Sequence, residues 1–391
     1  MDKVRYGIIG IGNMGSTHAT YLHEGAIEGA VLGAICDLKQ SRLDWAREKF
    51  GEDLPLFTDY KEMLKSGTCD VVLIATPHYD HPVIAIDAFA AGLNVISEKP
   101  VGVYTLAVEE MMKAAKASGK AFGVMFNQRT NPVYRKMREI VQSGELGELK
   151  RMVWIITDWY RTQYYYDSGD WRATWSGEGG GVLLNQCPHN LDLWQWIFGM
   201  PKYVTAFCDY GKYHDIEVED DVTAYGKYEN GATAVFITTT GECPGTNRLE
   251  ISGSKGKLVS EGSKLTWTKN EGDERVWCFE ATEGFKKLPT TKEVLEPEYD
   301  MLPQHKGITQ NFTNHLLKGE PLLASGYEGI NGLALSNAIM LSSWKNCTVD
   351  VTDPENAKEF YELLKGKIAT SRRKEKVAEE KVADLSSTYN N

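Results

Sequence analysis

Apolar runs alternate with helical patterns through the first third of the chain, and this alternation constrains the fold more than any other feature. The runs lie at residues 4–9, 31–36, 70–77, 93–97 and 121–126. Short apolar runs of this kind are typical of strands buried on both faces. Helical segments, among them 41–50 and 105–118, separate the runs. This order predicts an α/β domain with a doubly wound parallel sheet over residues 1–127.

The pattern changes after Asn131. A helix is expected at 132–143, followed by strands with alternating polar and apolar residues at 149–159, 203–209, 222–228, 232–240, 248–252 and 257–260. The turn at Glu229-Asn230-Gly231 is typical of a tight hairpin. Further helices are expected at 306–318, 327–345 and 354–367. The pattern predicts an α+β domain over 128–370, with a mostly antiparallel sheet covered on one face, and a charged, mobile tail over 371–391.

The net charge of the chain argues against some classes of binding partner. Lys and Arg number 43 against 54 Asp and Glu, a formal net charge of −11. This excess of negative charge argues against nucleic acid and against an anionic membrane surface. The chain has no long apolar stretch and no apolar leader at its N-terminus, so a cytoplasmic protein that does not enter a membrane is expected. The seven scattered cysteines favour reduced thiols over disulfides or zinc, and Cys187 is interpreted as a packing residue.

A glycine motif, Gly10-Ile11-Gly12-Asn13-Met14-Gly15, lies between the first strand and the first helix. The first glycine allows a tight turn, the second lets the backbone approach a pyrophosphate, and the third lets helix and strand pack closely. Backbone N–H groups at the start of the helix then face the negative diphosphate. The motif in this context predicts a dinucleotide site, and a plain turn between strand and helix is the alternative.

Asp37 ends the second strand, roughly twenty residues past the glycines, where an acid would bind the ribose hydroxyls of a dinucleotide. A carboxylate here repels a 2′-phosphate, so NAD is preferred over NADP, although nearby Lys39 and Arg42 keep NADP as an alternative. Asp37 is also a candidate N-cap for the helix at 41–50.

Two further strands end in polar motifs. Glu98-Lys99-Pro100 follows the run at 93–97, at the carboxyl end of a parallel strand, where open α/β sheets bind their ligands. Thr76-Pro77-His78 follows the preceding strand, and His81 opens the next helix. The two histidines suggest a metal, but no carboxylate or thiolate cluster accompanies them, so we predict cofactor or helix contacts and no metal site.

These motifs, in this order, resemble the Gfo/Idh/MocA oxidoreductase family, which includes glucose-fructose oxidoreductase and inositol 2-dehydrogenase. The resemblance covers about residues 4–350. It rests on the glycine loop, Ala75-Thr76-Pro77 with His81, Glu98-Lys99-Pro100, Asn127-Gln128-Arg129 before Asn131-Pro132, Trp171-Arg172, Gly179-Gly180-Gly181 leading to His189, and Gly326-Tyr327-Glu328-Gly329. It implies a Rossmann domain, a second domain whose open sheet builds homodimers or homotetramers, and reversible oxidation of a carbohydrate or polyol hydroxyl by a nicotinamide cofactor.

Motifs and resemblance together give a set of residues expected to bind the cofactor. They are Gly10, Gly12, Asn13, Met14, Gly15, Asp37, Arg42, Thr76, Pro77, His78, His81, Glu98, Lys99, Asn127, Trp171 and Arg172.

His189 and Lys99 are the two candidates for catalysis. Oxidation of a secondary alcohol needs a base for the hydroxyl proton, and His189, with an ordinary pKa of about 6.5, suits that role. Lys99 would donate a hydrogen bond to the same oxygen and stabilise alkoxide character. The alternative makes His189 a helix-start residue bonded to backbone and Lys99 a solvated strand end. The motif context favours catalysis.

Asn185 stands where many family members carry Asp, four residues before the histidine. A neutral amide can orient a substrate hydroxyl but cannot stabilise an imidazolium by charge. We therefore expect Asn185 to orient substrate, and the departure weakens a simple assignment as inositol dehydrogenase.

Aromatic residues crowd the segment between these motifs. Six of the ten tryptophans lie between 154 and 196, together with Tyr160 and Tyr164 to Tyr166, and such rings stack on sugars or build oligomer interfaces. The polar loop at 161–170 is the place expected for substrate-specific contacts. Expected substrate contacts are Arg129, Tyr160, Tyr164, Gln186 and His305.

The sequence thus predicts NAD-dependent oxidation of a ring hydroxyl of a sugar, glycoside or cyclitol, with a glycoside favoured by the aromatic segment. Two alternatives remain open. One is a glycosidase that retains NAD and oxidises the sugar transiently, and the other is a non-catalytic NAD-binding regulatory subunit.

Overall fold

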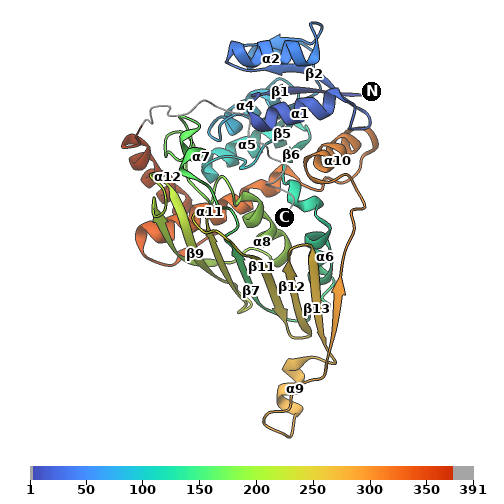
Figure 1. The fold of residues 1–391 in the computed structure, drawn as a ribbon, viewed down its shortest axis with the longest axis vertical. Coiled ribbons are helices and arrows are strands. Elements are labelled where there is room, and N and C mark those ends of the chain that lie inside the picture. The colour runs from blue at the N-terminus through green and yellow to red at the C-terminus, as the bar shows by residue number, and fades with distance from the viewer. Residues whose placement is uncertain (1–2, 373–391) are drawn as a thin grey trace.

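The computed structural model describes residues 3–372 and contains two sheets with helices packed on and between them (Figure 1). Most of the tail predicted from residue 371 onward, residues 373–391, lies outside the described residues. In residues 3–372, no helix has the length and apolar character that crossing a membrane requires.

The first sheet has six parallel strands in the order β3-β2-β1-β4-β5-β6. Their bounds are β1 Val4–Ile9, β2 Ala30–Cys36, β3 Leu56–Phe57, β4 Val71–Ile74, β5 Asn94–Ser97 and β6 Phe122–Val124. Every residue of β4 is buried, as expected for a strand covered on both faces. The predicted doubly wound sheet is confirmed, and its strand order changes direction between β1 and β4, where such sheets bind ligands.

The helices of this region alternate with the strands. They are α1 Asn13–His23, α2 Gln40–Phe50, α3 Tyr60–Lys65, α4 Asp80–Ala90 and α5 Thr105–Ser118. Helix α5 has the predicted bounds, and it ends at Gly119, whose φ of +66° is the left-handed conformation that closes many helices. The N-cap residue of α2 is Lys39, so the alternative role of Asp37 as N-cap is wrong.

The second sheet has nine strands in the order β14-β13-β12-β11-β7-β10-β9-β8-β15. Their bounds are β7 Leu149–Ile156, β8 Tyr203–Tyr210, β9 Glu219–Lys227, β10 Thr233–Thr239, β11 Asn247–Gly253, β12 Gly256–Glu261, β13 Lys264–Asn270, β14 Thr290–Leu295 and β15 Val349–Asp350. Strands β7 and β10 pair in parallel and the other neighbours are antiparallel, which confirms the predicted mostly antiparallel sheet. The predicted hairpin joins β9 to β10, where Lys227 pairs with Thr233 and Gly231 has a φ of +87°.

Helices cover one face of this sheet. They include α6 Pro132–Gln142, α8 Pro188–Phe198 and α11 Gly329–Lys345, and Figure 1 shows α8 and α11 between the two sheets. Helix α8 buries ten of its residues because it packs against α6, α11 and the inner face of the sheet. The remaining helices are α7 Gln163–Asp167, α9 Glu274–Glu280, α10 Gln304–Lys318 and α12 Pro354–Ala369, with short 3₁₀ turns at Asn127–Thr130 and Gly326–Glu328.

Two features of the later half of the chain differ from the expected layout. Strands β13 and β14, with α9 between them, form an arm that was not predicted and that projects from the sheet edge (Figure 1). Helix α10 returns to the first sheet and packs against β1, where the hydroxyl groups of Tyr6 and Thr313 lie 2.8 Å apart. The first sheet is therefore completed by residues near position 310.

Candidate active site

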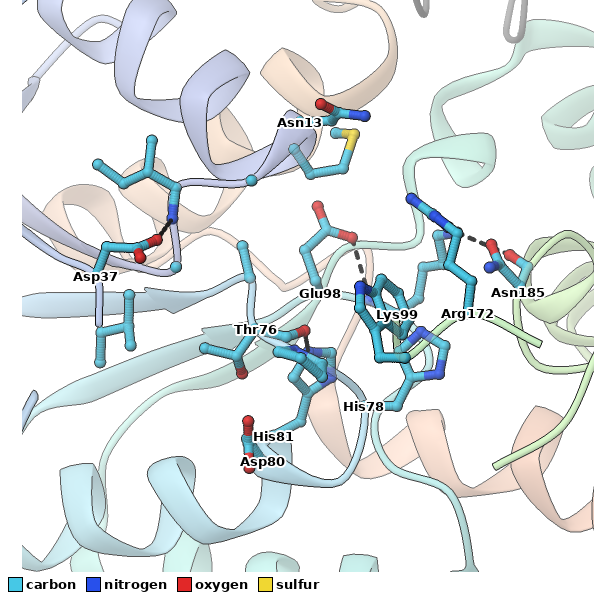
Figure 2. A pocket seen from close by; sticks show the side chains of 18 of the residues that line it. Asn13, Asp37, Thr76, His78, Asp80, His81, Glu98, Lys99, Arg172 and Asn185 are labelled. Carbon is cyan, nitrogen blue, oxygen red and sulfur yellow. Dashed lines mark hydrogen bonds between the residues drawn. The ribbon is translucent and has the colours of Figure 1, made fainter. Parts of the chain in front are cut away.

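A cavity of about 710 Å³ opens along the carboxyl ends of the parallel strands (Figure 2). Glycines follow β1, Asp37 follows β2, Thr76 lies just past β4, and Glu98 follows β5. The opposite wall comes from residues 159–189, at and before the start of α8. One cavity thus joins the predicted cofactor loop to the predicted catalytic pair.

Most of the predicted site residues line this cavity. They are Gly10, Gly12, Asn13, Met14, Asp37, Arg42, Thr76, Pro77, His78, His81, Glu98, Lys99, Trp171, Arg172, Asn185, Gln186 and His189.

The glycine turn has the geometry that the motif predicts. Gly10 has a φ of +90°, and a Cβ there would lie 2.7 Å from Ala75 O. A Cβ on Gly15 would lie 1.8 Å from Gly10 O, so Gly15 serves close packing and does not line the cavity. Apart from its chain neighbours, no atom of residues 3–372 lies within 4 Å of the Cβ position of Gly12. Helix α1 has no side-chain cap, which leaves its first N–H groups available to an anion.

Two further groups fit a bound dinucleotide. Asp37 accepts hydrogen bonds from Ile11 N and Lys39 N, both at 2.8 Å, so its carboxylate is fixed beside the glycine turn (Figure 2). The buried Oγ1 of Thr76 has no hydrogen-bond partner within residues 3–372, although such groups nearly always have one. The cavity therefore offers an open backbone approach, a fixed acid and an unsatisfied hydroxyl along one wall.

Glu98 is held from behind the cavity. Its Oε1 lies 2.6 Å from Nε2 of His18, and Nδ1 of His18 lies 2.5 Å from the Tyr21 hydroxyl. Burial alone would raise the pKa of Glu98, but the hydrogen bond and charge of His18 lower it to about 2. Glu98 therefore stays ionised and adds a fixed negative charge beside Lys99.

Lys99 points from the end of β5 toward the wall formed by residues 159–189 (Figure 2). Its Nζ donates to the main-chain oxygen of Asn185 at 3.0 Å. Burial lowers the pKa of Lys99 below its ordinary 10.5, while Glu98 opposes this change. An ammonium has three N–H donors, so this contact leaves capacity for an oxygen in the cavity.

His189 lies in the first turn of α8 and is 2 % exposed. Burial, and then the charge of Lys99, lower its pKa well below the ordinary 6.5. The imidazole is therefore neutral near pH 7, which is the form that accepts a proton. The two catalytic candidates thus lie in one cavity, where Lys99 can donate a hydrogen bond and His189 can accept a proton.

The two histidines near β4 contact the backbone. His81 has Nδ1 at 2.7 Å from Pro100 O and Nε2 at 2.8 Å from Thr76 O, which links the ends of β4 and β5. His78 has Nδ1 at 3.1 Å from Glu178 O. In the described part of the chain, no group of His, Cys, Asp or Glu has an arrangement that could hold a metal ion.

Besides Gly15, five of the predicted cofactor and substrate residues do not line the cavity. Arg129 is 0 % exposed and pairs with Asp192 at 2.6 Å and with Glu328, so the prediction that it contacts substrate is wrong. Tyr160 and Tyr164 are 46 % and 54 % exposed and lie outside the lining, and their assignment as substrate contacts stays a prediction.

Asn127 and His305 are buried behind the cavity wall. The Asn127 amide donates to Gln304 Oε1 at 2.8 Å. The ring of His305 lies 5.5 Å from that of His18. Both residues are buried and lie outside the lining, so their predicted contacts with cofactor and substrate stay predictions.

Several lining residues were not singled out from the sequence. They are Trp159, Arg161, Tyr165 and Asp170, and Arg161 and Arg172 both lie over the Tyr165 ring, at 5.2 and 4.6 Å. Three of the four belong to the loop at 161–170, where substrate contacts were expected, and Trp159 and Tyr165 also belong to the aromatic segment at 154–196. Gln186 lines the same wall, and its buried Oε1 has no hydrogen-bond partner among residues 3–372.

Comparison with known proteins agrees with this geometry. The model of the oxidoreductase family with an NAD-binding Rossmann fold matches residues 4–126, and that of the GFO/IDH/MocA C-terminal domain matches 134–259. Myo-inositol 2-dehydrogenase of Thermotoga maritima is 26 % identical over 344 residues, 86 % of this chain and 95 % of that protein. Mouse trans-1,2-dihydrobenzene-1,2-diol dehydrogenase is 27 % identical over 273 residues, 68 % of this chain and 77 % of that protein.

Solved structures give the same result. The WlbA dehydrogenase of Bordetella pertussis, solved with NADH and UDP-GlcNAcA, superimposes with a TM-score of 0.74 at 26 % identity. The match covers 89 % of this chain and 98 % of that one.

Proposed function

The chain belongs to the Gfo/Idh/MocA family of NAD-binding oxidoreductases, and from this premise we propose that it oxidises a secondary ring hydroxyl of a sugar, glycoside or cyclitol to the ketone. The observation that carries the proposal is the single cavity that holds both the glycine turn and the pair Lys99 and His189. A non-catalytic NAD-binding subunit would not need a buried neutral imidazole beside an ammonium at the cofactor site.

The residues divide the chemistry between them. His189, neutral because of burial, takes the proton of the substrate hydroxyl. Lys99 donates a hydrogen bond to the same oxygen and stabilises its growing negative charge, with an N–H that the Asn185 contact does not use. Bound NAD would supply the hydride acceptor. Asp37 and the glycine turn orient that cofactor, and the fixed negative charge of Asp37 favours NAD over NADP.

The substrate class follows from the cavity and from the relatives. The names of the relatives refer to a cyclitol and a ring diol, and the WlbA structure contains a nucleotide sugar acid. Trp159, Tyr165 and Trp171 give the cavity of this chain aromatic faces of the kind that stack on sugar rings. Gln186 offers an unsatisfied carbonyl oxygen to a substrate hydroxyl. These features support a pyranose, glycoside or cyclitol, and we favour a glycoside.

We also propose that the protein is a homodimer or homotetramer located in the cytoplasm. The outer face of the nine-stranded sheet carries exposed aromatic residues, among them Phe207, which is 69 % exposed, and Tyr225. They lie on the neighbouring strands β8 and β9, and their exposure supports burial against a second copy.

The test begins with purified protein, which is denatured to ask whether NAD is released. The intact protein is then incubated with free sugars, inositols and aryl glycosides, with and without added NAD, while NADH absorbance and product mass are followed. NADH formation with loss of two hydrogens from one substrate supports the proposal. Release of an aglycone without NADH would show the redox-assisted glycosidase instead, and bound NAD without any reaction would favour the regulatory subunit.

A further inference from the structure

Glu178 is a buried carboxylate that the sequence did not single out. It is 1 % exposed and lies in the loop between Arg172 and the glycines that precede α8. Its Oε2 accepts a hydrogen bond from Ala173 N at 2.6 Å, and Ala173 has a φ of +53°, an unusual conformation for a residue with a side chain. Its main-chain oxygen is the partner of His78. The carboxylate therefore helps to hold the loop with Ala173 in this unfavourable conformation.

The other oxygen of Glu178 binds a predicted catalytic residue. Oε1 accepts a hydrogen bond from the Nδ2 of Asn185, and the main-chain oxygen of Asn185 accepts one from Lys99 Nζ at 3.0 Å. Asn185 thus contacts Glu178 with its side chain and Lys99 with its backbone. An aspartate at 185 could not donate to Glu178, because an ionised carboxylate has no N–H or O–H. The amide at 185 and the carboxylate at 178 are complementary.

The charges around Lys99 show what this pair contributes. The carboxylates of Glu98 and Glu178 raise the pKa of Lys99, whereas burial and the guanidinium groups of Arg161 and Arg172 lower it. The charge of Lys99 in turn lowers the pKa of three neighbouring histidines, His78, His189 and His305.

The same balance acts on Glu178. Burial raises the pKa of Glu178 above its ordinary value, and Arg172, the bond from Ala173, Asn185 and Lys99 offset only part of this increase. Its charge also raises the pKa of Glu219 and of Tyr166, in both cases in addition to burial. The position of Glu178 is therefore coupled to Lys99 both by charge and through Asn185.

We propose that Glu178 and Asn185 act as one carboxylate–amide pair, in which Glu178 is the positioning residue that supplies negative charge to Lys99 and fixes Asn185 against it. The inference rests on the proposed function, because it assigns Lys99 a role in the reaction. It explains how this chain keeps a carboxylate beside the site although position 185 carries an amide. This chain has its carboxylate at position 178, whereas the resemblance leads us to expect one at position 185.

The test compares three variants with the wild type. Glu178→Gln removes the charge and keeps the shape. The double variant Glu178→Gln/Asn185→Asp exchanges the carboxylate and the amide between the two positions. Glu217→Gln is the matched control, because Glu217 also accepts a hydrogen bond from this loop, from Trp175 N at 2.8 Å, but its further partners include Ser371 and not Asn185. Melting temperatures show whether each variant folds.

The first readout needs no cofactor and no substrate. An amine-reactive reagent modifies lysines only in the uncharged form, so the rate of labelling at Lys99, followed by peptide mass spectrometry at fixed pH, reports its protonation. Loss of a nearby opposite charge changes a pKa by about one unit or more, so Glu178→Gln should label roughly tenfold faster than the wild type. The double variant and Glu217→Gln should label at the wild-type rate.

The second readout is the pH profile of kcat on the substrate found in the panel. The alkaline limb, where Lys99 loses its proton, should move down by about one pH unit in Glu178→Gln and return in the double variant. An unchanged labelling rate in Glu178→Gln would overturn the inference, and so would a double variant that labels as fast as Glu178→Gln. If Glu178→Gln does not fold, the double variant alone decides. A wild type that oxidises nothing would refute the proposed function, while labelling would still decide the role of Glu178.

Discussion

Two basic residues, the buried Arg129 and the half-buried Lys99, differ in what surrounds them, and the difference separates a role in stability from a role in chemistry. The guanidinium of Arg129 donates to Asp192 at 2.6 and 2.8 Å, to Glu328 and to Leu323 O at 3.0 Å, and none of these groups lines the cavity. Lys99 donates to one main-chain oxygen at 3.0 Å and faces the cavity. A charge whose donors bind protein partners holds the fold, whereas a charge with donors left over can bind a ligand.

The largest effect is expected in the cavity. Lys99→Met and His189→Ala should each lower kcat/KM for NADH formation by roughly 10²- to 10⁴-fold, because each removes a group that acts on the reacting oxygen. Melting temperatures should change little, since both side chains face a cavity. Lys306→Met, at an exposed position of α10, is the control and should keep full activity. Near-normal turnover in both cavity variants would contradict the assignment of Lys99 and His189 to catalysis.

Arg129→Met should have the opposite profile. It leaves the buried carboxylate of Asp192 without its cation, which should lower the free energy of unfolding by about 3–5 kcal/mol. Urea denaturation measures this loss. The exposed ion pair of Arg5 with Asp70 gives the matched control, and Arg5→Met should cost less than about 1 kcal/mol. If the Arg129→Met protein lost its activity while keeping its stability, Arg129 would act in the reaction and not in stabilising the fold.

The pH dependence sharpens the same contrast. His189 must be neutral to accept a proton, and because burial and Lys99 lower its pKa well below 6.5, the acid limb of kcat/KM should lie below pH 6.5. Lys99 must be charged to donate, and because burial lowers its pKa, the alkaline limb should lie below pH 10.5. Burial opposes the charge of Arg129, but Asp192 raises its pKa, so stability should show no transition from this group across that range. An acid limb above pH 6.5 would contradict the burial argument.

The smallest effect is expected at the far end of the cavity. Asp37 is intermediate between Arg129 and Lys99. Both of its oxygens accept hydrogen bonds from backbone N–H groups, yet it still lines the cavity. Asp37→Ser removes a charge that repels a 2′-phosphate, so the preference for NAD over NADP should fall by roughly 5- to 10-fold. Ratios of kcat/KM with the two cofactors measure it, with Asp44→Ser on the exposed face of α2 as control. An unchanged ratio would make Asp37 a purely structural acid.

Much of the fold could be predicted because its signals are local. The bounds of α5, the hairpin at Gly231 and the glycine turn each depend on residues close together in the chain. The projecting arm was missed for a physical reason. Helix α9 buries no residue, and β14 is exposed along nearly its whole length, so neither has the apolar periodicity that identifies an element. In β13, the alternation of Leu265 and Trp267 was a signal that could have been used.

The site was harder to predict from the sequence, because its contacts join residues that are far apart in the chain. Lys99 and His189 could be found from motifs, since each ends or begins an element at the ligand-binding edge. Arg129 was predicted to contact substrate, and its partner Asp192, which follows 63 positions later, could not be identified from the sequence. Glu178 lies in a loop without regular periodicity, so nothing in the sequence indicates that its carboxylate meets Asn185.

The return of α10 to the first sheet has a consequence for how the chain is made. The partner of the Tyr6 hydroxyl is Thr313, 307 positions later, and that of Tyr21 is Thr309. During translation, β1 and α1 leave the ribosome long before α10, so the nascent chain carries their α10-facing surface exposed until the later residues arrive. Contacts of such sequence separation slow folding and leave apolar surface open to association in the meantime. The dinucleotide-binding region therefore cannot complete its packing until the last quarter of the polypeptide has been synthesised. This region is thus the part of the chain that chaperones would be expected to bind during synthesis.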